Sequence, residues 1–106
     1  MEELSIELFN SLCANDVIKW TSHVLSRMRE RKITSDSVIS TMSSGKIIKQ
    51  YHDDKPYPSC LIYNNKNENP VHVVASSDGI NIYVITAYIP TLEEWEPDFQ
   101  TRKENL

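Results

Sequence analysis

The sequence is poor in glycine and contains no long hydrophobic run. Only two glycines occur among 106 residues, so a phosphate-binding glycine loop and a dinucleotide fingerprint are both absent. No stretch approaches the roughly 18 apolar residues of a membrane-spanning helix, and no association with membranes is expected. The first residues also lack the basic and apolar regions of a secretory signal. These absences predict a cytoplasmic protein.

Cysteine is scarce as well. Cys13 and Cys60 are isolated, and neither belongs to a CxxC pair that would indicate a zinc site. One interpretation is a disulfide between them, and the other is two reduced thiols in a cytosolic protein. HExxH and G-x-S-x-G motifs are also missing, which argues against a metalloprotease and a serine hydrolase. We therefore expect a protein without a metal or a cofactor.

The chain has no excess of positive charge. It carries 11 Lys and Arg residues against 15 Asp and Glu residues, which gives a net charge of -4. A protein that holds nucleic acid through its phosphates usually has a basic patch or a basic overall balance. The composition therefore argues against nucleic-acid binding over the whole surface and leaves room for a local cluster of cations on one face.

The remaining composition is that of a single globular domain, residues 1–106. Hydrophobic residues make up 40% of the chain and charged residues 25%, close to the globular average, and the length is too short for a second core. Helical periodicity and capping residues predict three helices, at residues 2–13, from Thr21 or Ser22 to about Arg31, and from the caps at 34–36 to Gly45. Gly45 is expected to have a positive φ at the end of the third helix.

After the third helix the pattern changes from helical to extended. Four strands are predicted, at residues 46–51, 59–63, 71–75 and 80–89. The last is apolar on both faces, with Ile82 and Val84 on one face and Ile85 and Ala87 on the other, which is typical of a central strand. We expect an α+β fold in which N-terminal helices pack on a four-stranded antiparallel sheet.

The segment after the last strand is expected to return to the core. Pro90 ends the strand because proline cannot donate to a β ladder. Thr91 and Glu94 have the spacing of a capping box, which predicts a helical turn that carries Trp95 toward the core.

A row of polar side chains follows the second predicted helix. His23, Arg27 and Arg31 are spaced four residues apart and therefore fall on one side of the helix, beside the sector of Val24 that faces the core. A partly sheltered row of cations suits an anionic group such as phosphate. A structural interpretation is also open, in which the arginines pair with carboxylates such as Glu30 and the histidine packs against a neighbouring aromatic ring.

Two further candidates lie on predicted strands. His72 interrupts an apolar strand, and it is either a general acid or base, because imidazole titrates near neutral pH, or a surface or core histidine bonded to a carbonyl group. Tyr88 lies at the end of the longest strand, where it either donates a hydrogen bond to phosphate or serves as a structural lid. Tyr51, Lys46 and Arg102 are weaker candidates of the same type.

Several separated motifs resemble one known family. They are His23-x-x-x-Arg27-Met28-x-x-Arg31-x-Ile33 with Val38 and Gly45 downstream, Tyr51-x-Asp53-Asp54-x-Pro56-x-Pro58-Ser59-x-Leu61, Pro70-x-His72-Val73-Val74, and Thr86-x-Tyr88-x-Pro90 with Trp95 downstream. They are similar to a prokaryotic family described as domain of unknown function 4258 and grouped with RelE- and ParE-type toxins. The resemblance covers about residues 20 to 102.

The resemblance implies a RelE-like fold and, as in many members of the wider superfamily, a ribonuclease toxin held inactive by an antitoxin protein. The resemblance also implies that the site residues are His23, Arg27, Arg31, His72 and Tyr88. The expected function is a metal-independent endoribonuclease that acts on RNA or at the ribosome. The two histidines would serve as base and acid, the two arginines would stabilise charge on the phosphate, and the tyrosine would orient it.

The alternative is a non-catalytic protein-interaction module of the same fold. The acidic net charge departs from the basic character usual for such toxins. A positive cleft that contains both His23 and His72 is expected for the enzyme and not for the module.

Overall fold

The computed structural model describes residues 3–65 and 69–104. Its elements follow in the order α1 (Ile6–Cys13), β1 (Ile18–Lys19), α2 (Ser22–Glu30), α3 (Ser35–Ser44), β2 (Lys46–Tyr51), β3 (Ser59–Asn64), β4 (Val71–Ser77) and β5 (Ile82–Tyr88). None of the helices in the described ranges has the length and apolar character needed to cross a membrane.

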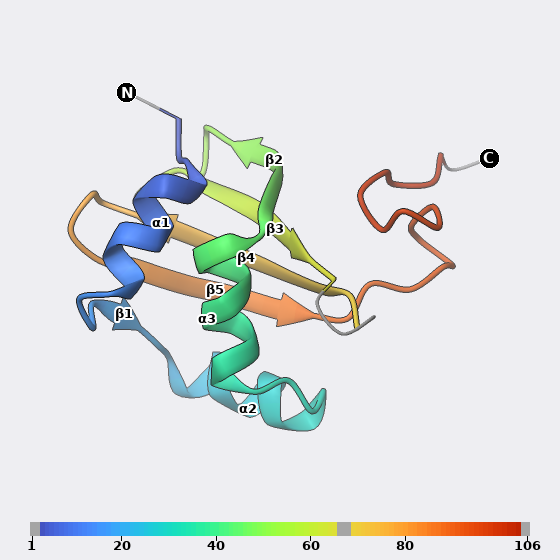
Figure 1. Ribbon diagram of the computed structural model, residues 1–106, viewed down its shortest axis with the longest axis horizontal. Coiled ribbons are helices and arrows are strands. Elements are labelled where there is room, and N and C mark those ends of the chain that lie inside the picture. The colour runs from blue at the N-terminus through green and yellow to red at the C-terminus, as the bar shows by residue number, and fades with distance from the viewer. Residues whose placement is uncertain (1–2, 66–68, 105–106) are drawn as a thin grey trace.

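The strands form one five-stranded mixed sheet in the order β1-β5-β4-β3-β2 (Figure 1). The four longer strands pair in antiparallel fashion, as the sequence predicted. The prediction of a four-stranded, wholly antiparallel sheet is wrong, because Ile18–Lys19 adds a short strand that runs parallel to β5. Two residues are too few to show a period of their own, so the hydrophobic pattern could not reveal this strand.

Polar caps fix the starts of the three helices. The side-chain oxygens of Ser5, Thr21 and Thr34 each accept a hydrogen bond from the backbone N–H three residues later, which pairs a donor that the helix start leaves free. The predicted caps at Thr21 and in the segment 34–36 are confirmed. The first helix begins at Ile6, after its cap, and not at residue 2, which lies outside the described residues.

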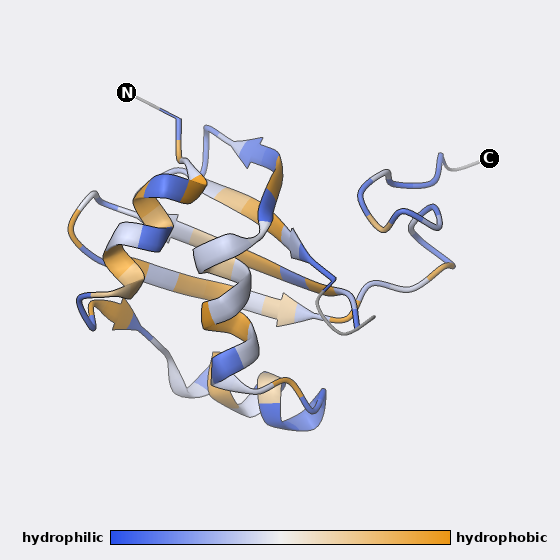
Figure 2. Ribbon diagram, viewed as in Figure 1, coloured by the Kyte–Doolittle hydropathy of each residue, from blue (hydrophilic) through white to orange (hydrophobic). Residues whose placement is uncertain are grey.

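The helices cover one face of the sheet. In Figure 1, α1 and α3 cross that face and α2 lies beside β5. Alternate residues of the strands, such as Ile62 and Val73, join a core with Phe9 of α1 and Met42 of α3. Figure 2 shows apolar residues along the strands and on the helices that cross them. Burial of this face is the main contribution to the stability of the fold.

The C-terminal segment, residues 91–104, packs on the opposite face. Leu61 and His72 alternate with the core residues and therefore point to that side, where the Trp95 ring contacts the His72 ring at a centroid distance of 4.5 Å. A single turn, closed by the Trp95 N–H donating to the Thr91 carbonyl at 2.9 Å, carries this tryptophan to the sheet. The prediction that Trp95 becomes buried is confirmed.

A β-bulge in β5 changes which side chains share a face. Two neighbouring residues of β4 pair with Val84 and Thr86, so Ile85 is an extra residue on β5. Ala87 consequently lies in the core with Val84, whereas Ile85 is 44% exposed. The predicted alternation, with Ala87 on the face opposite Val84, is wrong because it assumed a strand without a bulge.

Gly45 ends α3 with a φ of -80°, so the predicted positive φ is wrong. Glycine is required at this position because there is no room for a side chain. A Cβ atom at this position would overlap the backbone carbonyl oxygen of Thr41 and would lie 2.6 Å from that of Tyr63. Since both obstacles are backbone atoms, no side chain can rotate away to make room.

Gly45→Ala is expected to lower the free energy of unfolding by about 1–3 kcal/mol, the usual cost of overpacking. Urea denaturation followed by circular dichroism measures this change. Ser44→Ala, at the exposed neighbouring position, is the control and should remain within about 0.5 kcal/mol of wild type. Equal midpoints for Gly45→Ala and wild type would contradict the steric requirement.

Candidate functional site

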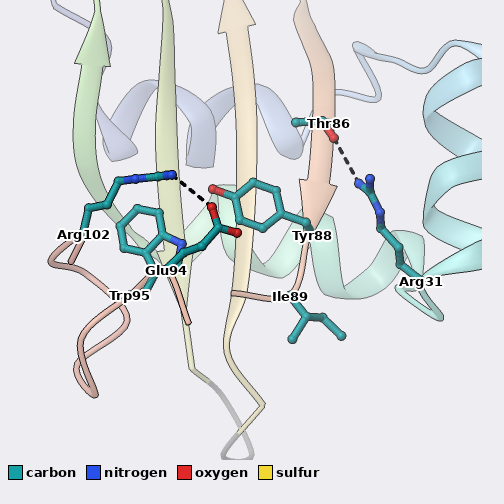
Figure 3. A pocket seen from close by; sticks show the side chains of 7 residues that line it. All are labelled: Arg31, Thr86, Tyr88, Ile89, Glu94, Trp95 and Arg102. Carbon is teal, nitrogen blue, oxygen red and sulfur yellow. Dashed lines mark hydrogen bonds and ion pairs between the residues drawn. The ribbon is translucent and has the colours of Figure 1, made fainter. Parts of the chain in front are cut away.

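An open cavity of about 660 Å³ lies between the C-terminal ends of α2 and β5 and the C-terminal segment (Figure 3). Its walls are formed by Arg31, Thr86, Tyr88, Ile89, Glu94, Trp95 and Arg102. Two guanidinium groups, a phenol and a carboxylate thus belong to the residues that line one space. This combination of groups suits an anionic ligand.

Arg31 extends from the end of α2 to β5. Its Nη1 donates to the carbonyl oxygen of Ala87 at 2.8 Å and to Thr86 Oγ1 at 3.4 Å. Within residues 3–65 and 69–104 no acceptor engages Nε or Nη2 and no carboxylate pairs with this side chain. Three of its five N–H donors therefore remain for a ligand.

Arg102 lies on the opposite wall, in the C-terminal segment. Its Nη2 donates to Glu94 Oε2 at 3.0 Å, and its guanidinium lies 5.7 Å from the centroid of the Trp95 ring. Both charged side chains are more than half exposed, and ion pairs of this kind contribute little to stability. A phosphate can therefore displace the carboxylate from Arg102 at low cost.

Tyr88 is held in place by a buried chain of hydrogen bonds. His72 has no exposed surface, its Nε2 lies 2.7 Å from the Phe99 carbonyl oxygen, and its Nδ1 lies 3.1 Å from Tyr88 Oη. A carbonyl oxygen only accepts, so Nε2 carries the proton and Nδ1 accepts the hydroxyl proton of Tyr88. This chain fixes the phenol at the wall of the cavity.

Burial sets the ionisation of both groups in this chain. It lowers the pKa of His72, against a smaller opposing effect of the hydrogen bond to Phe99, because desolvation disfavours the charged imidazole. Burial also raises the pKa of Tyr88 to about 12. At pH 7 the imidazole and the phenol are therefore both neutral.

The structure brings Arg31 and Tyr88 together but does not bring His23 or Arg27 to them. His23 and Arg27 are exposed on α2 and do not line this cavity, and Arg27 pairs with Glu30 at 3.4 Å. His72 lies behind Tyr88, with the buried carbonyl bond that the structural interpretation predicted. Because it has no exposed surface, no cleft in the described part of the chain contains both histidines.

The wall formed by the C-terminal segment carries only weak signals in the sequence. Arg102 is only a weaker candidate in the sequence, and Glu94 is noticeable there only for its spacing from Thr91. The spacing of Thr91 and Glu94 did predict a turn, but a turn does not reveal which face of the sheet the chain covers next. That information is contained in the contact between Trp95 and His72.

The described residues contain no group of three His, Cys, Asp or Glu side chains that could hold a metal ion. Cys13 and Cys60 are both free thiols, so the structure does not contain the disulfide considered above. Burial raises the pKa of Cys13, and it raises that of Cys60 to about 12. Both thiols are therefore protonated at pH 7 and are poor nucleophiles.

Comparisons with known proteins give one family. No curated protein sequence and no solved structure matches the chain. A family model described as "Domain of unknown function (DUF4258)" matches residues 20–89. The match includes Arg31 and Tyr88 and ends before Glu94, Trp95 and Arg102. It therefore covers the wall of the cavity formed by α2 and β5 but not the wall formed by the C-terminal segment. Since the match spans more than half of the sequence, the chain belongs to the DUF4258 family.

Proposed function

We propose that this protein is a toxin-like, metal-independent endoribonuclease whose site is the cavity between Arg31 and Arg102. The observation that supports it is that one open space is lined by two guanidinium groups, which lie on either side of Tyr88 (Figure 3). A planar guanidinium group can donate two parallel hydrogen bonds to two oxygens of the same phosphodiester. A focused site of this kind is compatible with a net charge of -4.

Cleavage in this cavity would use the RNA as its own nucleophile. The ribose 2′-oxygen forms a bond to the adjacent phosphorus while the bond from phosphorus to the 5′-oxygen breaks, which leaves a 2′,3′-cyclic phosphate and a 5′-hydroxyl. Glu94, once displaced from Arg102 by the phosphate, accepts the 2′-hydroxyl proton. Arg31 and Arg102 stabilise the charge that develops on the phosphoryl oxygens.

The leaving 5′-oxygen needs a proton. Tyr88 supplies it in this scheme, because its pKa of about 12 keeps the phenol protonated at pH 7, and its hydroxyl can turn from His72 toward the cavity. The proton returns from Glu94 to Tyr88 through water after the products leave. Arg31 thus keeps its predicted role, and Arg102 takes the role first considered for Arg27. Tyr88 serves as the acid, a role predicted for a histidine, instead of orienting the phosphate.

The relation to RelE- and ParE-type toxins and a prokaryotic origin are part of the same proposal. They rest on the sequence motifs, and the α+β order with helices on one face of an antiparallel region supports them. The proposal predicts an antitoxin that holds the protein inactive and an RNA or ribosomal target in the cytoplasm.

A non-catalytic interaction module of the same fold is the second candidate. The burial of His72 favours it, because both ring nitrogens are engaged inside the protein and cannot exchange protons with a ligand directly. In that case the cavity binds an acidic segment of a partner protein and cleaves nothing.

Purified protein incubated with single-stranded RNA in EDTA tests the proposal. We expect 2′,3′-cyclic phosphate ends to form, and Arg102→Ala to slow cleavage by about 100-fold, the effect of losing one donor to developing charge. Arg29→Ala, an exposed arginine of α2 outside the cavity, is the control and should retain the wild-type rate. If the RNA stays intact both with and without ribosomes, the endoribonuclease proposal is overturned and the non-catalytic interaction module becomes the favoured function.

A further inference from the structure

A second cavity, of about 190 Å³, adjoins the first on the same face of the sheet. Lys49, Tyr51 and Gln100 are among the residues that line it. Tyr88, Trp95 and Arg102 line both cavities. A ligand longer than one cavity can therefore pass from one to the other across Arg102.

Arg102 lines both cavities together with the phenol of Tyr88, and it lines the second together with the phenol of Tyr51. Burial raises the pKa of Tyr51 and of Tyr88, and the positive charge of Arg102 opposes that rise in each case. Since Arg102 lines both cavities, its guanidinium can contact a ligand in either one.

Lys49 adds a third cation to this face. It is exposed on β2, and its Nζ lies 5.4 Å from the centroid of the Tyr51 ring. No carboxylate in the described ranges forms an ion pair with it. The neighbouring Lys46 donates to Gln100 Oε1 at 2.8 Å, a bond that links β2 to the C-terminal segment.

We propose that the second cavity is a subsite for the next nucleotide of single-stranded RNA. Arg31 and Arg102 hold one phosphate, and Lys49 and Arg102 hold the neighbouring one. The Tyr51 ring lies beside that lysine, and cations interleaved with aromatic rings are the usual means of holding a single strand. This inference rests on the proposed function and defines its substrate as an extended polynucleotide rather than a mononucleotide.

Binding of a labelled 2′-O-methyl RNA octanucleotide, which lacks the attacking hydroxyl, tests the subsite by fluorescence anisotropy. We expect Lys49→Gln to weaken binding by about 5- to 10-fold and to reduce the slope of log affinity against log salt by about 0.7, the value for one phosphate contact on a single strand. Lys49→Arg should retain the wild-type slope. Affinity for a nucleoside 3′-monophosphate, measured by competition, should be the same in Lys49→Gln and wild type.

Lys19→Gln is the matched control, because Lys19 is exposed on β1 and lines neither cavity. Wild-type octanucleotide affinity and salt slope in Lys49→Gln would overturn the second subsite. The proposed function would still stand in that case if Arg102→Ala abolished binding. If wild type binds no RNA, or binds a polyglutamate peptide in its place, both proposals are overturned.

Discussion

Arg31→Ala is expected to lower the rate of RNA cleavage by about 100- to 1000-fold, the range that follows removal of one donor to a developing negative charge. Within residues 3–65 and 69–104, Arg102 pairs with Glu94, whereas Arg31 has no carboxylate partner. Its hydrogen bond to Ala87 also holds the guanidinium in position before a ligand arrives. A preorganised charge of this kind costs no reorganisation during the reaction.

Arg31→Lys separates the charge from the hydrogen-bonding geometry. Lysine keeps the positive charge but not the planar pair of donors, so an intermediate loss of about 10-fold is expected. Urea denaturation of the same variants measures the loss of folding stability, which is expected to be about 1 kcal/mol for the hydrogen bond to Ala87. Steady-state rates on a single RNA substrate measure the catalytic part.

Arg27→Ala is the matched control for Arg31→Ala. Arg27 is an exposed arginine on the same helix, it pairs with Glu30, and it does not line the cavity. It should retain wild-type cleavage. If Arg27→Ala and Arg31→Ala lose activity equally, the site lies along α2, as the sequence spacing first suggested, and not in the cavity.

Local signals predicted most of the fold. Thr21 and Thr34 cap the helices as expected, and the four strands that follow Gly45 lie close to their predicted positions. What could not be predicted depends on pairing between distant segments. The parallel strand Ile18–Lys19 exists because it pairs with β5, and the bulge at Ile85 exists because of its register with β4. Neither leaves a periodic pattern in the chain.

The candidate site could be predicted only in part, because its position also depends on contacts between segments that are distant in the sequence. The spacing of His23, Arg27 and Arg31 assumes that the helix continues through all three. Arg31 is instead the C-cap, at the end of α2, and there its side chain bonds to Thr86 and Ala87 of β5, while the other two are exposed. Its partner across the cavity, Arg102, comes from a segment whose position depends on packing over the second face of the sheet.

His72→Ala is expected to lower the free energy of unfolding by about 3–5 kcal/mol, since it removes a fully buried side chain and two hydrogen bonds. A domain of this size is stabilised by only about 5–15 kcal/mol in total. His72→Phe keeps a ring between Tyr88 and Trp95 but leaves the Phe99 carbonyl and the Tyr88 hydroxyl without their partner. It isolates the hydrogen-bond part, about 1–3 kcal/mol. Urea denaturation at pH 7.5 measures both variants.

The dependence of stability on pH provides a second test of the same residue. Burial lowers the pKa of His72 in the folded state below its ordinary value of 6.5. Between these two pKa values the unfolded chain binds more protons than the folded one, so stability rises with pH in that window and falls on acidification, by up to about 1.4 kcal/mol per pH unit. Wild type should therefore lose stability between pH 7 and pH 5, whereas His72→Phe should lose less.

Asp78 and Asp98 have lowered pKa values and affect stability only below the pH window of His72. Hydrogen bonds to the backbone hold the pKa of Asp98 below its usual value, and they hold that of Asp78 at about 2. Their contributions are present above the unfolded pKa and disappear only below about pH 4.5, outside the window of His72. His23→Ala, at an exposed position, should keep the wild-type slope. If His72→Phe also kept it, the acid sensitivity would belong to another group, and His72 would not be the neutral buried imidazole that holds Tyr88 at the cavity.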